Sequence, residues 1–255
     1  MATESGPAID PIHQFSIHPV VSILVAGHDV SLTNSGLFML LAVALSCLLV
    51  AIGARGTTGV PGRMQAMAEM AYEFVAGMVR SAAGEEGMRF FPFVFSIFLF
   101  VLLCNLIGFL PFSFTVTGQI VITAALALMV FFTVVIIGVK EHGLHFFKLF
   151  VPDGVPLYIL PLVVAIEVIS FLTRPLSHSV RLFANMLAGH ITLYVFGSFV
   201  LMLLGAAAVT KALAILPFAM TIGLEALELL VAFLQAYVFA MLTCMYLNDA
   251  LHPGH

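Results

Sequence analysis

Long stretches without a charged residue are the feature that most constrains this chain. Residues 30–54 contain no Asp, Glu, Lys or Arg, and residues 90–139 continue for 50 residues without one. A helix needs about 20 apolar residues to cross a bilayer, so the second stretch is long enough for two crossings. Charged residues make up 9% of the chain, against roughly 25% in an ordinary soluble domain. We therefore predict a polytopic membrane protein, and we exclude a typical soluble enzyme and a basic nucleic-acid binder.

The breaks between the apolar stretches predict how the N-terminal half crosses the membrane. Residues 30–54 form a first span, and a turn near Pro111 divides residues 90–139 into a second and a third span. The preceding residues, 1–29, are expected to be a tail on the outer side of the membrane.

Two longer apolar stretches follow, at about 157–204 and 210–248, separated by the small residues 205–208. Each is too long for an upright helix, because about 20 residues suffice for one crossing. We expect two tilted helices paired as an antiparallel hairpin within residues 157–250. The whole chain, residues 1–255, is then a single all-α membrane domain with about five transmembrane helices.

Residues 62–86 show a different pattern, in which apolar side chains recur at three- and four-residue steps while charged ones occupy the other faces. This periodicity is typical of an amphipathic helix that lies in the membrane interface. A packed helix of a soluble part of the protein is the alternative. The apolar positions are Met64, Met67, Ala71, Phe74 and Met78.

Basic residues predict the orientation. Arginines gather in the connection 54–89 and lysines in the connection 140–156, whereas residues 1–29 and the turn 111–118 contain neither. Because basic connections stay on the cytoplasmic side, we expect the N-terminus outside and the C-terminus in the cytoplasm. The sequence has no Arg-rich, acid-poor leader, which favours a bacterial inner membrane over an organelle.

Charged side chains nevertheless lie inside the last two apolar stretches. A charge at the bilayer centre costs at least about 2.5–3.5 kcal/mol on insertion scales, so ionisable residues there are candidates for function. Structural ion pairs between packed helices are the alternative explanation. The residues are Glu167, Arg174, Arg181, Glu225 and Glu228, with the polar Asn185, His190 and Gln235.

Helical spacing orders these side chains into stripes. At 100° per residue the polar residues between Glu167 and Asn185, including His178, fall within about 60° of one another, with Ser170 and Ser177 beside them. If the hairpin turns near residue 208, the polar groups occur at three depths. These are an outer level (His190, Glu225, Glu228), a middle level (Arg181, Gln235) and an inner level (Glu167, Ser170, Arg174).

Titratable groups at several depths are what proton transfer through lipid requires. Carboxylates and imidazoles can take up and release protons near neutral pH. A guanidinium cannot, so Arg181 would interrupt a continuous proton path. The pattern predicts two access paths separated by a fixed positive charge.

Three segments of the sequence resemble one known family. RPLSHSVRLFANMLAGH (174–190) closely matches the most characteristic motif of the a subunit of F-type ATP synthases, whose core reads Arg-Leu-Phe-x-Asn-Met. ALELLVAFLQAYVFAMLTCMYLNDA (226–250) is similar to the last helix of that family, and FLFVLLCNLIGFLPFSF (98–114) to its second span. The resemblance covers nearly the whole chain.

This resemblance implies a role for each matching residue. Arg181 would be the essential arginine that faces the carboxylate of the rotating c-ring, and Asn185 and Gln235 would be its polar neighbours. His190 and Glu228 would belong to the outer half-channel, and the depth of Glu225 suits the same channel. Many bacterial members have a carboxylate at the first of these positions and a histidine at the second, so this chain has the pair exchanged. The inner half-channel would contain Glu167, Ser170 and Ser177, with Arg174 where a lysine is often found.

The resemblance also implies the partners. They are the c-ring, b-type peripheral stalk subunits, the rest of the FoF1 complex, the lipid bilayer and translocated H⁺. No nucleic acid, cofactor or metal is expected, and the three cysteines show no metal-ligand spacing. A single subunit is expected to have no catalytic activity of its own.

Three other functions compete with this interpretation. A proton-coupled secondary transporter also holds midplane charges, but such folds usually show internal repeats, and none is evident here. An intramembrane enzyme is disfavoured because HGLH (142–145) lacks the glutamate of H-E-x-x-H and no G-x-S-x-G occurs. A passive structural subunit would explain the spans but not the aligned polar stripes.

Overall fold

The computed structural model describes residues 15–21, 24–25, 28–29, 31–54, 62–110, 113–151, 156, 158–205 and 208–252. Within these residues, five helical segments are long and apolar enough to cross a membrane. The predicted class, an all-α polytopic membrane protein, is confirmed.

Helices account for nearly all the regular structure in the described ranges. The α-helices are α1 Asn34–Gly53, α2 Arg63–Gly87, α3 Phe91–Gly108, α4 Ile120–His142, α5 Leu160–Leu204, α6 Ala208–Leu213 and α7 Ile215–Leu251. Short 3₁₀ helices are η2 Met88–Phe90, η3 Val116–Gly118 and η4 Gly143–Phe150. The sequence did not predict the four short strands before α1, which pair antiparallel as β1 (Pro19–Val21) with β4 (Leu32–Thr33) and β2 (Leu24–Val25) with β3 (His28–Asp29).

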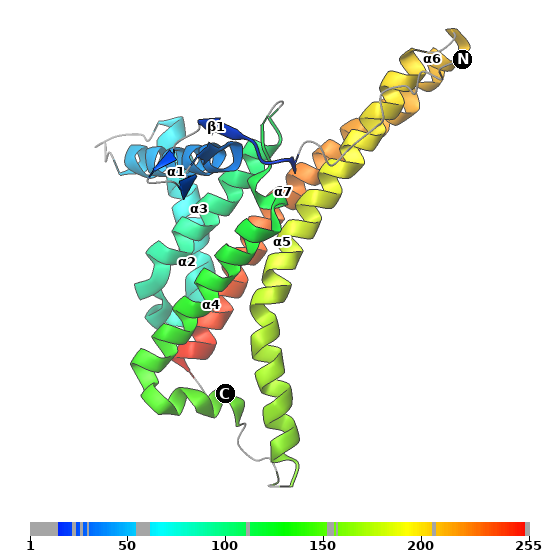
Figure 1. Ribbon diagram of the computed structural model, residues 1–255. Coiled ribbons are helices and arrows are strands. Elements are labelled where there is room, and N and C mark those ends of the chain that lie inside the picture. The colour runs from blue at the N-terminus through cyan, green and yellow to red at the C-terminus, as the bar shows by residue number, and fades with distance from the viewer. Residues whose placement is uncertain are drawn as a thin grey trace.

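The first helix lies at the side of the molecule (Figure 1). Thr33 caps α1, because its side-chain oxygen accepts a hydrogen bond from the backbone N–H of Gly36. Half of the residues of α1 are exposed and two are buried, of which Ala42 packs into a small cluster with Cys104 of α3. An apolar, largely exposed helix of 20 residues suits a surface bathed in lipid.

The second helix turns sharply into the third. Gly84 has a φ of +65°, a conformation that side chains other than glycine rarely adopt, and it kinks the end of α2 before η2. Val75 and Val79 of α2 are fully buried against the core, whereas Met64 and Met67 are about half exposed. The location of α2 at the membrane interface stays a prediction.

The last two long helices form a hairpin that extends well beyond the other helices, with α6 at its tip (Figure 1). At 1.5 Å per residue the 45 residues of α5 span about 68 Å, which is more than twice the thickness of a hydrocarbon core of about 30 Å. A membrane therefore accommodates α5 only at a steep tilt. Pro175 lies inside this helix and leaves one backbone carbonyl without its usual donor.

The core forms where α7 passes between its neighbours. This helix packs against α2, α3, α4 and α5. Ala232, Ala236 and Ala240 are completely buried there, and such small residues let helix backbones approach closely. The base of the hairpin is thus fixed to the rest of the protein.

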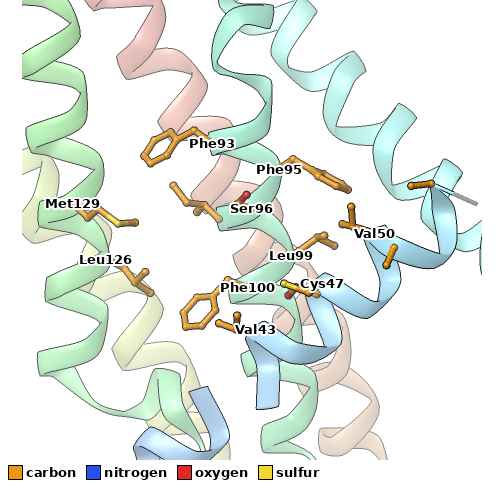
Figure 2. A pocket seen from close by; sticks show the side chains of 14 residues that line it. Val43, Cys47, Val50, Phe93, Phe95, Ser96, Leu99, Phe100, Leu126 and Met129 are labelled. Atoms are coloured by element: carbon orange, nitrogen blue, oxygen red, sulfur yellow. The ribbon is translucent and has the colours of Figure 1, made fainter. Parts of the chain in front are cut away.

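An apolar groove of about 740 Å³ opens between α1, α3 and α4 (Figure 2). Its lining includes Phe93, Phe100 and Met129 but no charged side chain. The hydroxyls of Ser46 and Ser96 both donate hydrogen bonds to carbonyls of their own helices. The groove therefore offers contact area for apolar chains, but its described lining has no charged group and no uncommitted hydroxyl donor for a reaction.

Candidate functional site on the long hairpin

Contacts between α5 and α7 place the predicted polar residues at matching levels. His190 and Glu228 face each other towards the tip of the hairpin, and Arg174 and Asp249 face each other towards its base. Both pairs agree with an antiparallel hairpin that turns near residue 208, where α6 is found. The middle of the hairpin, near Arg181, separates the two pairs.

The outer cluster centres on Glu228, whose side chain is 6% exposed. Its Oε1 lies 3.7 Å from Nε2 of His190, and neither carboxylate oxygen has a hydrogen-bond partner among the described residues. Nε2 of His190 also shares a hydrogen bond of 3.0 Å with the hydroxyl of Thr115. Gly189 lies against Glu228, and a β-carbon there would collide with the carboxylate. The arrangement is an acid beside an imidazole, enclosed by protein, which is suited to proton exchange.

Other predicted outer residues are not part of this contact. Glu225 lies about one turn before Glu228 on α7 and is exposed, with no ion pair or hydrogen bond from its side chain in the described ranges. Thr115, by contrast, was not predicted. It belongs to the connection between α3 and α4, and nothing in the local sequence distinguishes it from other threonines.

The middle level holds Arg181 on the exposed face of α5. Its guanidinium has no hydrogen-bond or ion-pair partner among the residues that the structure describes. Ala184 and Ala188, which follow it on the same side of the helix, are also exposed. Exposed apolar neighbours are typical of a surface that meets lipid or a membrane partner. An unpaired cation in lipid alone is very unfavourable, so this face requires a partner or water.

Polar side chains near the level of Arg181 lie on two sides of the hairpin. Asn185, Ser170 and Ser177 share the exposed side with Arg181. On α7, Gln235 is buried at the level of Arg181, and no hydrogen bond joins the two side chains in the described part of the chain. Polar groups thus occupy both the inside of the hairpin and its outer face.

The inner cluster is held by an ion pair. Nη1 of Arg174 donates a hydrogen bond of 2.6 Å to Oδ2 of Asp249. The same guanidinium lies over the rings of Tyr246 and Phe171, at 5.1 and 5.4 Å from their centroids. Glu167 is half-buried nearer the start of α5 and makes no such contact in the described region. Helical counting in the sequence puts Asp249 at the inner end, level with Glu167, and the structure pairs it with Arg174 instead.

Comparison with known proteins decides the family. The model of the family described as ATP synthase A chain matches residues 36–248. A protein named ATP synthase subunit a from Nitrobacter winogradskyi is 61% identical over 248 residues, covering 97% of this chain and 100% of the relative. Proteins of the same name from Rhodopseudomonas palustris and Bradyrhizobium diazoefficiens are 59% and 60% identical, each over 97% of this chain and 100% and 99% of the relative. The chain belongs to the ATP synthase A chain family.

Membership confirms the resemblance and makes the chain a multi-pass membrane subunit of an ATP synthase, with ATP synthesis and hydrogen-ion transport as the activities of the complex. The matched segment contains every predicted site residue from Glu167 to Gln235. Asp249 lies one position beyond it.

Buried polar contacts hold the hairpin against the other helices of the chain. Nδ2 of Asn105 on α3 donates a hydrogen bond of 3.0 Å to the carbonyl of Ala232 on α7. Oδ1 of Asn105 accepts a hydrogen bond of 2.8 Å from the hydroxyl of Thr117. The hydroxyls of Thr123 on α4 and Ser179 on α5 lie 3.2 Å apart. These bonds fix the polar clusters of the hairpin relative to α3, α4 and η3.

Proposed function

We propose that this chain is the a subunit of the Fo motor, in which Arg181 faces a carboxylate of the c-ring between two offset proton half-channels. One observation carries the proposal. Arg181 is exposed and unpaired within the described residues, on a face of α5 that it shares with the uncharged side chains of Asn185 and Ser177. A ring of helices that presents one carboxylate at a time would cover this face and supply the missing negative charge.

The positions of the two clusters support offset channels. Along α5, His190 lies about 14 Å from Arg181 and Arg174 about 11 Å in the other direction, at 1.5 Å per residue. A tilted α5 converts part of this separation into distance along the membrane plane. Protons entering at one cluster and leaving at the other would therefore reach the ring at different points of its circumference.

Charge explains how such a device produces rotation. A ring carboxyl group in lipid is stable when protonated, because burial disfavours the charged form. Beside Arg181 the carboxylate is stabilised by the opposite charge, so the proton is released there. Each proton that crosses yields about 2.3 kcal/mol per 100 mV of membrane potential. Arg181 holds its own proton, so it separates the channels instead of joining them.

The remaining predicted residues take supporting roles in this proposal. His190 and Glu228 exchange protons in the outer half-channel, with Glu225 at its exposed side. Glu167, Ser170, Ser177 and Arg174 contribute to the inner half-channel. The two amides, Asn185 on the exposed face and Gln235 inside the hairpin, provide polar surroundings at the level of Arg181.

The proposal includes partners and orientation. The c-ring covers the Arg181 face, and b-type stalk subunits and the rest of the complex hold the chain against ring movement. The chain resides in a bacterial inner membrane with its N-terminus outside and its C-terminus in the cytoplasm. Support comes from bacterial relatives of nearly full length and from the distribution of basic residues.

Replacing Arg181 with alanine tests the proposal. ATP synthesis and ATP-driven proton pumping are measured in inverted membrane vesicles that contain equal amounts of assembled complex. We expect Arg181→Ala to abolish driven synthesis while the complex stays assembled. Arg80→Ala is the matched control, because Arg80 forms an exposed ion pair with Glu85 on α2, and such pairs contribute about 0–1 kcal/mol. Normal synthesis by assembled Arg181→Ala complexes would disprove the mechanism.

A further inference from the structure

His178 is a buried histidine that the proposed mechanism does not use. Its residue exposure is 3%, and Nε2 has no hydrogen-bond partner in the described part of the chain. The ring lies against Phe239 of α7, with 3.7 Å between the ring centroids. Buried polar atoms are nearly always hydrogen-bonded, and leaving one without a partner is costly. A leucine would fill similar space without that cost, so the imidazole calls for an explanation beyond packing.

The location of His178 suggests a functional explanation for the buried imidazole. Arg181 follows three residues later on α5, which brings the two Cβ atoms within about 5–6 Å. On the other side the ring of Tyr246 lies 6.0 Å from the imidazole, between centroids. Tyr246 in turn lies beneath the guanidinium of Arg174, which binds Asp249. His178 therefore bridges the space between the central arginine and the inner ion pair.

The charged and titratable groups around His178 can be named for each helix that packs near it. On α5 they are Arg181 and Arg174, and on α7 they are Tyr246 and Asp249. Titratable side chains of α4 are confined to its last turn, Lys140–His142. The nearest positive charge thus lies towards the ring-facing side, and the nearest carboxylate lies towards the base of the hairpin.

We infer that His178 relays protons between the Arg181 region and the inner surface, which deepens the proposed function and rests on it. A ring carboxylic acid that reaches Arg181 releases its proton, and the neutral imidazole accepts it at Nε2 through water. The resulting imidazolium is repelled by Arg181 and gives a proton to water on the side of Tyr246 and Asp249. The imidazole returns to its neutral form, so one proton moves inwards and no other bond changes. Imidazole suits this step because it has two nitrogens, so that one can accept a proton while the other releases one.

Three substitutions of His178 test the relay in assembled complexes. His178→Gln keeps a polar side chain, His178→Leu keeps the volume, and His178→Ala leaves space for a free imidazole molecule. We measure ATP synthesis and ATP-driven pumping in membrane vesicles from pH 6 to pH 9, normalised to the amount of complex. We expect each rate to fall about tenfold or more, because an acid–base group is lost, and the pH profile to change shape. Millimolar imidazole should restore part of the rate of His178→Ala.

Two controls separate this inference from the proposed function. His142→Gln removes another histidine of the chain, one whose Nε2 contacts the carbonyl of Leu251 near the base of α7, and should leave rates and pH profile unchanged. Arg181→Ala is measured in parallel. If it retains driven synthesis, the proposed function fails. If it abolishes synthesis while assembled His178→Leu or His178→Gln keeps the wild-type rate and pH profile, the relay alone is overturned. Imidazole that restores nothing to His178→Ala also contradicts the relay.

Discussion

At the scale of single residues, a glycine allows the outer cluster to form. Gly189 lies on the face of α5 that meets Glu228, and the carboxylate occupies the volume that a β-carbon would need. The same carboxylate lies 3.7 Å from His190, the next residue on α5. A side chain at position 189 would therefore push Glu228 away from its imidazole partner.

The substitution Gly189→Ala is predicted to impair proton entry without preventing folding. Alanine raises helix propensity by about 1 kcal/mol, but displacing Glu228 costs roughly 1–3 kcal/mol, as overpacking does elsewhere. Driven ATP synthesis should fall severalfold at equal amounts of complex. Gly197→Ala on the same helix is the control, since its β-carbon would meet no atom within 4 Å. Equal activity in the two variants would show that the close contact between Gly189 and Glu228 does not affect function.

Sequence reasoning found the residues of the clusters better than their contacts. The intramembrane positions of Glu228 and His190 were visible because charge and polarity stand out in apolar runs. Their shared dependence on Gly189 and Thr115 was not, because a glycine and a threonine cause no such contrast. The partner of Arg174 was missed for a different reason. A small error in the assumed alignment of two long antiparallel helices shifts the residue that is predicted to lie opposite by a whole helical turn.

At the scale of elements, buried hydrogen bonds orient helices that apolar packing alone leaves free to slide. Asn105 is fully buried and connects α3 to the backbone of α7 and to Thr117. Both bonds form where membrane helices have no hydrophobic drive towards one another. The bonds of this asparagine set the height of α7, and with it the level of Gln235.

The substitution Asn105→Leu is expected to loosen this connection. It leaves the hydroxyl of Thr117 without its acceptor, a penalty of about 1–3 kcal/mol for a buried polar group. The thermal midpoint of the purified complex and the yield of the chain in membranes should both decrease. Thr133→Val is the comparison, because that hydroxyl bonds only to the carbonyl of Met129 in its own helix among the described residues. An unchanged midpoint for Asn105→Leu would refute the role of this asparagine as a connector.

The elements themselves were more predictable than their packed faces. Charge-free runs locate helices such as α1 and α4 because a membrane tolerates little else. The face that α2 buries was harder to predict, since both of its sides contain apolar residues. Val75 and Val79 enter the core, while Met64 and Met67 stay half exposed. In lipid an exposed apolar side chain carries no penalty, so hydrophobicity alone does not distinguish the two faces.

At the scale of the whole molecule, an odd number of crossings places the two ends of the chain on opposite sides. Five candidate spans are present in the described residues. The connection between α3 and α4 contains no basic residue, whereas Lys140 and Arg89 lie at the opposite ends of these helices. The basic ends should face the cytoplasm.

Cysteine labelling tests this orientation. Cys47, Cys104 and Cys244 are first replaced, and single cysteines are introduced as Ser113→Cys and His252→Cys. A membrane-impermeant maleimide should label position 113 in right-side-out vesicles and position 252 in inverted ones. ATP synthesis in the parent without cysteines serves as the control for folding. Labelling of both positions from the same side would contradict the predicted topology.

The central position of α7 also determines when the chain can finish folding. During synthesis α2, α3, α4 and α5 leave the ribosome before α7. All four nevertheless pack against α7 in the folded chain. Until α7 arrives, the amide of Asn105 lacks the carbonyl of Ala232, and α5 has α4 beside it but lacks its second long neighbour. The earlier helices must therefore wait in the membrane as a loose assembly, and the native arrangement becomes available only near the close of synthesis.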